Sequence, residues 1–532
     1  MFDVWSRMIA SLVCSVLFCV ATLQSVGALQ QSGYKGSVYV SWLRKKENLF
    51  FNRLWVWALC LALVSAVTTL CFSFLGTVAA LAVSAIPFSL LCGLFIFSDR
   101  KFALKVPVKR TKRLQRLFVA YWFIVAVFCY IFIAVLAFLA KWNGSPFYAL
   151  IAFVPFCATP VLLPLLLCLA NAIMSIFENA HNQKFIKRAG QVLDETNIIR
   201  VGVVGSYGKT SVKNILNAIL SEKYDVVATP ASYNTPMGVA LTVTAPDFAK
   251  KQVFIAEMGA RKTGDVKELC AMVKPQYAVF TGVCEQHIAT FGSIENVWAE
   301  KSEILRSGAT VVCGGALRAA VEKDGLQDHA RFVEDTLFKD VHLQATKTQF
   351  VLCLDGKEIP VACSLLGESA LENIALAVAL AKEMGLTAEE IIKGIEKLTP
   401  IEHRLQLIRS GDVYILDDGY NCNPLGAAVA IKALCRFSGR KCIVTPGIVE
   451  CGILEEQTNA DLGAKIAKAN LDLVILVGET LVTSVKNGYI TAGGDGENLQ
   501  VVKTLKDAQN VLAAWLTAGD AVLFLNDLPD VY

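Results

Sequence analysis

Residues 205–211 read Gly-Ser-Tyr-Gly-Lys-Thr-Ser, directly after the apolar run at 198–204 and directly before a helical pattern. A glycine-containing turn between a buried strand and a helix lets backbone N–H groups close around phosphate oxygens, and the helix N-terminus adds positive charge. Lys209 can reach terminal phosphates, and the Thr210 hydroxyl can bind magnesium. The stretch predicts a nucleotide-binding loop, although Val203 stands where the general GxxxxGK[ST] pattern has its first glycine. The residues expected to contact the nucleotide are Gly205, Ser206, Gly208, Lys209, Thr210 and Ser211.

The chain around and after this loop alternates short apolar runs with helical patterns, which indicates a mostly parallel sheet covered by helices. The first runs lie at 198–204, 253–256, 277–280 and 310–312. A second series follows Arg404, at 413–416, 441–444, 473–477 and 521–525. We therefore expect two α/β domains, a central P-loop domain at 199–399 and a separate Rossmann-like domain at 400–532.

Five apolar stretches near the N-terminus are each long enough to cross a bilayer: 8–29, 54–76, 77–98, 117–140 and 147–174. A cleaved signal peptide is the alternative for the first stretch, but its apolar core is long, Arg7 is the only basic residue before it, and four similar stretches follow. Residues 1–174 are thus predicted to form an α-helical polytopic membrane domain with about five transmembrane helices. Residues 175–198, polar and mixed in charge, are expected to form a cytosolic linker.

Basic residues gather in two of the loops between these stretches. The positive-inside rule places both loops in the cytoplasm, which puts the N-terminus outside and everything after Met174 inside, where ATP is available. Binding of anionic lipid head groups is an alternative use of these loops. The basic residues are Lys35, Arg44, Lys45, Lys46 and Arg53 in the first loop, and Arg100, Lys101, Lys105, Lys109, Arg110, Lys112, Arg113 and Arg116 in the second.

Composition narrows the class of protein. The chain has 532 residues, of which 55% are hydrophobic, so it is too long for one core and too apolar for a soluble enzyme. Its net charge of +4 is nearly balanced and gives no reason to expect a nucleic-acid partner. The 17 cysteines form no CxxC pair, and many lie in apolar runs, so we expect reduced thiols rather than disulfides or a zinc site.

Further sequence blocks follow the loop in a fixed order. Residues 234–239 read NTPMGV, 257–261 read EMGAR, 291–293 read FGS, 299–303 read AEKSE, and 417–424 read DDGYNCNP. Together with the loop, these blocks resemble those of the Mur ligases, and the form GSxGKTSxK is typical of the branch that adds D-alanyl-D-alanine. The resemblance covers the chain from about residue 199 onward and implies the fold expected above.

The resemblance implies a magnesium site. Glu257 and Thr210 would hold one ion, and His287 would bind a second; a strand-end carboxylate and a structural histidine are the alternatives. Lys301 lies fourteen residues after His287, where the family has a lysine that carries CO2 as a carbamate. The alternative for Lys301 is an exposed helix lysine. Lys209, His287 and Lys301 are therefore the expected catalytic residues.

The resemblance also implies nucleotide and substrate contacts. Asn373, Arg404 and Asp418 are expected at the ATP, with Arg404 at a hinge between the domains. The expected substrate-site residues are Asn234, Thr235, Tyr420, Asn421 and Asn423. The chain departs from the family at Ser369 and Ala370, where histidine and asparagine are usual, and at Asn526-Asp527, where a KGS sequence is usual.

The implied activity is an ATP-dependent amide-bond ligation that passes through an acyl phosphate. The substrates would be a muramoyl-peptide-type carboxylate, UDP-linked or lipid-linked, and an amino acid or dipeptide amine such as D-alanyl-D-alanine. Only about twenty-five residues separate the last apolar stretch from the first strand, too few for the family's UDP-sugar-binding domain. We expect the protein in the bacterial cytoplasmic membrane, in contact with membrane lipid.

Three other functions are alternatives to D-alanyl-D-alanine addition. The first alternative is a ligase that adds a different amino acid or extends a polyamide or capsule-like polymer. A transport ATPase is disfavoured, because no LSGGQ-type segment is present and the DDGYNCNP block has no role in such a protein. A nucleotide-binding scaffold without catalysis is the third alternative, suggested by Ser369 and Ala370.

Overall fold

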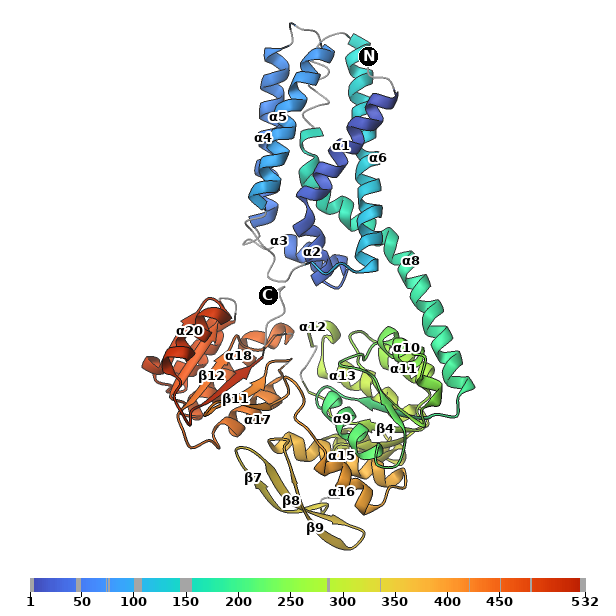
Figure 1. The fold of residues 1–532 in the computed structure, drawn as a ribbon, viewed down its shortest axis with the longest axis vertical. Helices are drawn as coiled ribbons and strands as arrows, with labels where there is room; N and C mark the ends of the chain where they lie inside the picture. Colours follow the sequence, from blue (N-terminus) through green and yellow to red (C-terminus); the bar gives the residue numbers. More distant parts are fainter. Residues whose placement is uncertain are drawn as a thin grey trace. The chain divides into compact units, whose positions relative to one another are not determined.

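The structure, a computed structural model, describes residues 4–44, 49–72, 74, 77–99, 108–143, 156–284, 288–334, 336–420, 422–449, 451–478 and 481–526. The chain divides into two compact units, the first ending at His181 and the second running from Asn182 to Leu528 (Figure 1). The first unit is helical, and the second contains three β-sheets. This arrangement confirms the predicted fold class, a helical region followed by α/β domains.

The helices of the first unit are α1 (Val4–Ala21), α2 (Leu23–Gln31), α3 (Gly36–Arg44), α4 (Leu49–Cys71), α5 (Thr77–Asp99), α6 (Lys112–Asn143) and the start of α8 (Thr159–Glu195). Within the described residues, four helices are long and apolar enough to cross a membrane: α1, most of α4 and α6, and α8. The apolar part described in α5, Ala85–Ser98, is shorter than these four. Two of the predicted spans lie partly outside the described residues: 147–174 at its start and 54–76 at its end.

The first expected span, 8–29, is not one helix. It breaks at Thr22 between α1 and α2. The Thr22 hydroxyl lies 2.9 Å from the carbonyl oxygen of Phe18, to which it donates, and 2.9 Å from the Tyr121 hydroxyl. A threonine that bonds back to the preceding turn bends a helix, and here α6 supplies a second polar partner at the bend.

The expected linker at 175–198 is helical as far as Glu195, because α8 continues through it without a break. Ala189 and Leu193, in the last turns of α8, are fully buried in a hydrophobic core of the second unit. The end of α8 is therefore part of the folded second unit and not a separate connector.

The central domain is built on a six-stranded parallel sheet of order β2-β3-β1-β4-β5-β6. Alternate side chains of its strands enter two different cores: Val201 and Val203 pack on one face, and Val204 and Phe254 on the other. The predicted runs at 198–204, 253–256, 277–280 and 310–312 match strands β1, β3, β4 and β5 within a residue. The strands are β1 (Ile199–Val204), β2 (Val226–Ala228), β3 (Val253–Glu257), β4 (Tyr277–Phe280), β5 (Thr310–Cys313) and β6 (Ala330–Phe332).

Helices cover this sheet. One face carries the cluster that includes α9 (Lys209–Leu220), α15 (Glu368–Glu383) and α16 (Ala388–Glu396). The other carries α10 (Pro236–Val243), α11 (Asp265–Val273), α13 (Ile294–Lys301) and the end of α8. The short helix α12 (Ile288–Phe291) precedes α13, and α14 (Arg318–Lys323) lies between β5 and β6.

A three-stranded antiparallel sheet, which the sequence reading did not predict, follows β6. Its strands are β7 (Phe338–Leu343), β8 (Thr348–Leu354) and β9 (Lys357–Cys363). Side chains of β8 alternate between buried and half-buried, and the buried apolar ones, Phe350, Leu352 and Leu354, join the same core as α15 and α16.

The C-terminal domain is built on a second six-stranded sheet, of order β10-β11-β15-β12-β13-β14, in which β10 alone among the described strands is antiparallel to its neighbour. The predicted runs at 413–416, 441–444, 473–477 and 521–525 coincide with β11, β12, β13 and β15. The elements are β10 (Gln406–Ser410), β11 (Val413–Asp418), α17 (Pro424–Leu434), β12 (Lys441–Thr445), α18 (Glu455–Lys468), β13 (Leu473–Val477), α19 (Val482–Thr491), β14 (Leu499–Val502), α20 (Leu505–Trp515) and β15 (Ala521–Leu525).

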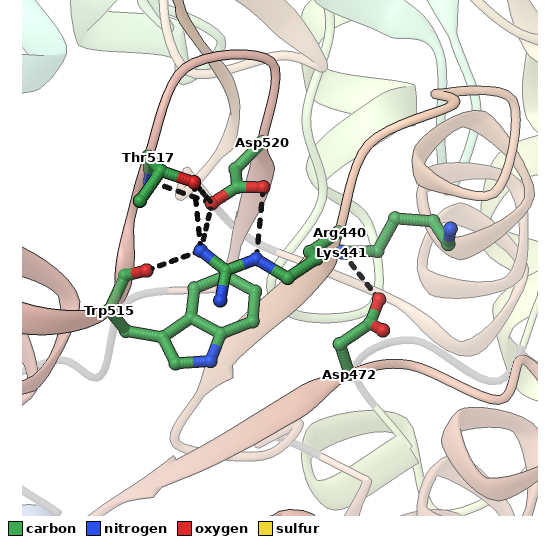
Figure 2. Close-up of polar contacts among 6 residues, drawn as sticks. All are labelled: Arg440, Lys441, Asp472, Trp515, Thr517 and Asp520. Carbon is green, nitrogen blue, oxygen red and sulfur yellow. Dashed lines mark hydrogen bonds and ion pairs between the residues drawn. The ribbon is translucent and has the colours of Figure 1, made fainter.

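A polar cluster holds the amino ends of three parallel strands of this sheet (Figure 2). The Arg440 guanidinium donates to both carboxylate oxygens of the buried Asp520, at 3.2 and 2.6 Å, and stacks over the Trp515 ring at 4.2 Å. The N–H of Lys441 donates to Asp472 at 2.7 Å. Because Arg440, Asp520 and Asp472 directly precede β12, β15 and β13, the cluster lies at the opposite edge of the sheet from the carboxyl end of β11.

Candidate active site

The loop between β1 and α9 requires glycine at two positions. Gly205 has a φ of +153° and Gly208 a φ of +72°. A Cβ atom at Gly205 would lie 1.9 Å from Thr281 Oγ1, and one at Gly208 would lie 2.5 Å from Asn373 Oδ1. The Ser206 hydroxyl is buried and has no hydrogen-bond partner within the described residues. The loop is therefore tightly enclosed and leaves a buried polar group for a ligand.

Two lysines converge on this loop. Lys209 Nζ donates to the carbonyl oxygen of Gly205 at 2.7 Å and to that of Ser206 at 3.3 Å. Lys301 Nζ donates to the same Gly205 oxygen at 3.0 Å, and Glu300 beside it accepts from the N–H groups of Gly264 and Val266, which fixes α13 against α11.

Lys301 is buried and Lys209 is half-buried, and both have lowered pKa values. Burial lowers the pKa of Lys209. Burial and the neighbouring charge of Lys209 lower the pKa of Lys301 to about 7. The ion pairs that the structure describes involve neither of these two ammonium groups. Such a pair of cations favours an anion at this place, as phosphate oxygens would supply.

Glu257 ends β3 beside the loop and is 1% exposed. Its Oε2 accepts from the Thr210 hydroxyl at 3.0 Å, and its Oε1 accepts from Asn234 Nδ2 at 3.1 Å. Lys213 Nζ lies 3.2 Å from Oε2. The sequence reading missed Lys213, although it is the last residue of the quoted GSxGKTSxK form and lies one helical turn after Lys209.

A pocket of about 600 Å³ connects these groups to the C-terminal domain. It is lined by the loop, α15, the segment around Arg404, the end of β11 and the first turn of α17. Ser369 and Ala370, which depart from the family pattern, also line it. The sequence-predicted residues that line the pocket are Ser206, Gly208, Lys209, Thr210, Ser211, Asn234, Glu257, Lys301, Asn373, Arg404, Asp418, Tyr420 and Asn423.

The C-terminal domain contributes a carboxylate and an aromatic ring to this pocket. Asp418 accepts a hydrogen bond from the N–H of Leu405 at 3.0 Å, and burial raises the pKa of its carboxyl group to about 6. The Arg404 guanidinium lies 4.5 Å from the centre of the Tyr420 ring. The Tyr420 hydroxyl is 2.5 Å from that of Ser232, a hydrogen bond that joins the two domains.

Two of the expected substrate residues cap helices. Thr235 Oγ1 accepts from the N–H of Gly238 at 3.2 Å at the start of α10, and Thr235 is not among the residues lining the pocket. Asn423 Oδ1 accepts from the N–H groups of Leu425 and Gly426 at the start of α17. These contacts satisfy free N–H groups of a first helical turn, so both residues have a structural role. His287 and Asn421 lie outside the described residues.

The residues fit a magnesium ion that takes most of its ligands from phosphate and water. No group of three or more His, Cys, Asp or Glu side chains able to hold a metal occurs among the residues that the structure describes. Magnesium in nucleotide sites commonly uses one or two protein oxygens besides phosphates. The Glu257 carboxylate and the Thr210 hydroxyl, whose oxygens lie 3.0 Å apart, supply two such protein oxygens.

Known proteins match both domains of the second unit. The model of the Mur ligase middle domain matches residues 203–381, and that of the Mur ligase, glutamate ligase domain matches residues 403–526. The UDP-N-acetylmuramoyl-tripeptide–D-alanyl-D-alanine ligase of Bacillus subtilis (strain 168) is 29% identical over 350 residues, 62% of this chain and 74% of that protein. The ligase of the same name from Treponema pallidum (strain Nichols) is 27% identical over 336 residues, 61% of this chain and 71% of that protein.

A solved structure shows the same fold. The MurF ligase from Thermotoga maritima in complex with ADP has a TM-score of 0.59 and 24% identity, and the match covers 66% of this chain and 81% of that one. The first match ends at residue 381 and the second begins at residue 403, directly before the expected hinge at Arg404. This chain therefore belongs to the Mur ligase family of ATP-dependent acid:amino-acid ligases.

Proposed function

We propose that this protein uses ATP to add D-alanyl-D-alanine to a muramoyl peptide in peptidoglycan synthesis. The observation that carries the proposal is the convergence of Lys209 and Lys301 on one carbonyl oxygen, beside the Glu257–Thr210 pair. The names of the relatives from B. subtilis and T. pallidum support the choice of substrates.

In the proposed reaction, the substrate carboxylate attacks the ATP γ-phosphate, and the resulting acyl phosphate is displaced by the incoming amine to give an amide, ADP and phosphate. Lys209 and the loop N–H groups neutralise charge on the phosphates, which is the main contribution a protein makes to phosphoryl transfer. Glu257 and Thr210 hold magnesium. Asn373, Arg404 and Asp418 surround the nucleotide, and Asn234 and Tyr420 face the substrates.

Lys301 is proposed to carry CO2 as a carbamate. Only a neutral amine reacts with CO2, and a pKa of about 7 makes a large fraction of Lys301 neutral near physiological pH. The carbamate would replace one of two facing cations with an anion and, with His287, would provide oxygen and nitrogen ligands for a second magnesium ion.

We propose that the protein lies in the bacterial cytoplasmic membrane with its ligase domains in the cytoplasm. The apolar helices of the first unit support the membrane location, and the basic residues at 108–116 support the orientation. Since helices stand where the family's UDP-sugar-binding domain is expected, we propose that the muramoyl peptide is lipid-linked.

Phosphate release by the detergent-purified full-length protein tests the function. ATP and magnesium are supplied with D-alanyl-D-alanine and either UDP-linked or lipid-linked muramoyl tripeptide. Turnover that requires both substrates and disappears in Lys209→Ala supports ligation. Nucleotide binding without turnover on either carrier contradicts the proposed substrates and favours a different acceptor or a scaffold role.

A further inference from the structure

A buried lysine supports a second loop, residues 229–235 between β2 and α10, which contacts both the phosphate site and the C-terminal domain. Lys213, on α9, is 2% exposed, and its side chain has two partners. Its ammonium donates a hydrogen bond to the carbonyl oxygen of Ala231 and pairs with Glu257 at 3.2 Å. Lys213 does not line the pocket, and no step of the proposed reaction uses it.

Ala231 needs such support because its backbone is strained. Its φ of +44° is unfavourable for a residue with a side chain, and such conformations persist only where neighbouring groups hold them. The hydrogen bond from Lys213 holds the carbonyl group of this residue. A second attachment follows at Asn234, whose amide donates to Glu257 at 3.1 Å. Both attachments of the loop therefore lead to Glu257, the proposed magnesium ligand.

One of the two residues between these attachments contacts the other domain. Ser232 directly follows Ala231, and its hydroxyl is 2.5 Å from the Tyr420 hydroxyl. The Tyr420 ring in turn lies against the Arg404 guanidinium at the expected hinge. Ser232 and Tyr420 both line the pocket. A chain of direct contacts thus runs from Thr210 and Glu257 through Lys213, Ala231 and Ser232 to Tyr420.

We propose that Lys213 is a positioning residue that couples magnesium–nucleotide binding at Glu257 to closure of the C-terminal domain. It does so by holding Ala231 in the conformation that presents Ser232 to Tyr420. This inference rests on the proposed function, because it takes magnesium–ATP as the ligand. Coupling of this kind is a free-energy link between two sites through an element that both of them contact.

Amide hydrogen exchange of the full-length protein in detergent tests the coupling, with and without magnesium and a non-hydrolysable ATP analogue. In the unaltered protein, we expect the analogue to slow exchange both in the loop at 205–211 and in the segment that contains Tyr420, each by about tenfold or more. In Lys213→Met, the loop at 205–211 should stay protected by the analogue, while the segment that contains Tyr420 should lose its protection. Ser232→Ala, which removes only the hydroxyl that crosses the domains, should give the same result.

Two further variants separate coupling from a general structural role. Lys223, three residues after the end of α9, also donates a hydrogen bond to a carbonyl oxygen, that of Gly385. Lys223→Met removes this bond and should behave like the unaltered protein. Adding Ala231→Gly to Lys213→Met should restore part of the protection, because glycine adopts a positive φ without strain.

Three results would overturn the proposal. The first is full protection of the Tyr420 segment in both Lys213→Met and Ser232→Ala. The second is loss of analogue binding in Lys213→Met with no change in Ser232→Ala, since Lys213 would then serve the ligand directly. The third is failure of the unaltered protein to bind the analogue, which alone would also refute the proposed function.

Discussion

At the scale of single residues, the site is organised by buried charges whose balance is incomplete without a ligand. Lys209 and Lys301 share one acceptor, the Gly205 oxygen, and the charge of Lys209 is one reason why the pKa of Lys301 is low. Glu257 is paired with Lys213, and its charge only partly offsets the effect of burial on the pKa of Lys209. The excess positive charge therefore lies where phosphate and a carbamate are proposed to bind.

The pKa of Lys301 predicts a dependence of stability on pH. Because its pKa in the folded protein, about 7, is below the usual lysine pKa of 10.5, the unfolded chain binds more protons between these two pH values. Stability contributed by this lysine is present above about pH 10 and is lost as the pH falls through about 7. The melting temperature of the unaltered protein in CO2-free buffer should thus rise relative to that of Lys301→Met between pH 7 and pH 9.5. Parallel curves for the two proteins would contradict a lowered pKa.

Glu257→Gln should abolish the contribution of magnesium to nucleotide binding. The amide keeps the shape of the side chain and a hydrogen bond with Thr210 but removes the charge that a magnesium ion needs. We expect the unaltered protein to bind ADP at least about tenfold more tightly with magnesium than with EDTA, and the variant to show no such gain. Glu358→Gln, which alters an exposed ion pair with Lys339, is the control. A magnesium effect that survives in Glu257→Gln would place the ion elsewhere.

Most of the predicted site residues that the structure describes line the pocket, because glycines, lysines and carboxylates at strand ends have recognisable patterns. Lys213 was missed because a lysine within a helix gives no sign that it is buried; its partners, Ala231 and Glu257, come from distant parts of the chain. The capping roles of Thr235 and Asn423 were also not predicted, although a polar residue directly before proline at a helix start is a capping signal.

At the scale of helices and strands, long apolar runs were predictable and short or mixed strands were not. The central strands β1, β3, β4 and β5 lie mostly buried between two cores, so their sequences are largely apolar. The outer strands β2 and β6 have three residues each and are not buried, which leaves little pattern to detect. In β9, Pro360 argues against a strand, yet β9 lies at the edge of its three-stranded sheet, where proline is tolerated.

The contact between α18 and α19 depends on two glycines. A Cβ atom on Gly463 would lie 2.0 Å from the carbonyl oxygen of Val485, and one on Gly488 would lie 1.9 Å from that of Ala460. Gly463→Ala should therefore force the helices apart and cost about 1–3 kcal/mol of unfolding free energy. Gly190→Ala in α8 is the matched control: no atom lies within 4 Å of its Cβ position, so the gain in helix propensity should dominate. Equal melting temperatures for the two variants would contradict this account.

At the scale of the whole molecule, one helix takes part in both compact units. The first part of α8 belongs to the apolar helical unit, where Leu163 and Leu167 are fully buried. Its last turns, with Ala189 and Leu193, belong to a core of the second unit. Large apolar side chains such as Leu59, Leu63 and Phe97 remain more than 60% exposed in the first unit, as expected for helices that face lipid.

The boundary of the soluble unit should follow α8 and not the first strand. A fragment that begins at residue 182 keeps Ala189 and Leu193, whereas one that begins at 199 removes both and uncovers the core beneath them. We expect the longer fragment to stay soluble without detergent and to unfold cooperatively, and the shorter one to lose several kcal/mol, since each buried apolar side chain contributes about 1.5–3 kcal/mol. Similar denaturation midpoints for the two fragments would show that the end of α8 adds little.

The fragment beginning at 182 also tests whether the muramoyl peptide is lipid-linked, as proposed, or UDP-linked. If the helical unit binds the lipid that carries the muramoyl peptide, the full-length protein in detergent should use the lipid-linked substrate with a kcat/KM at least about tenfold above that of the fragment, while binding of magnesium–ADP to the two proteins stays equal. Equal nucleotide binding ensures that the difference arises at the carrier and not at the phosphate loop. Tight binding of the UDP-linked peptide by the fragment would contradict the lipid-linked proposal, because the ligase domains alone would then recognise the soluble carrier and the helices would serve only to hold them at the membrane.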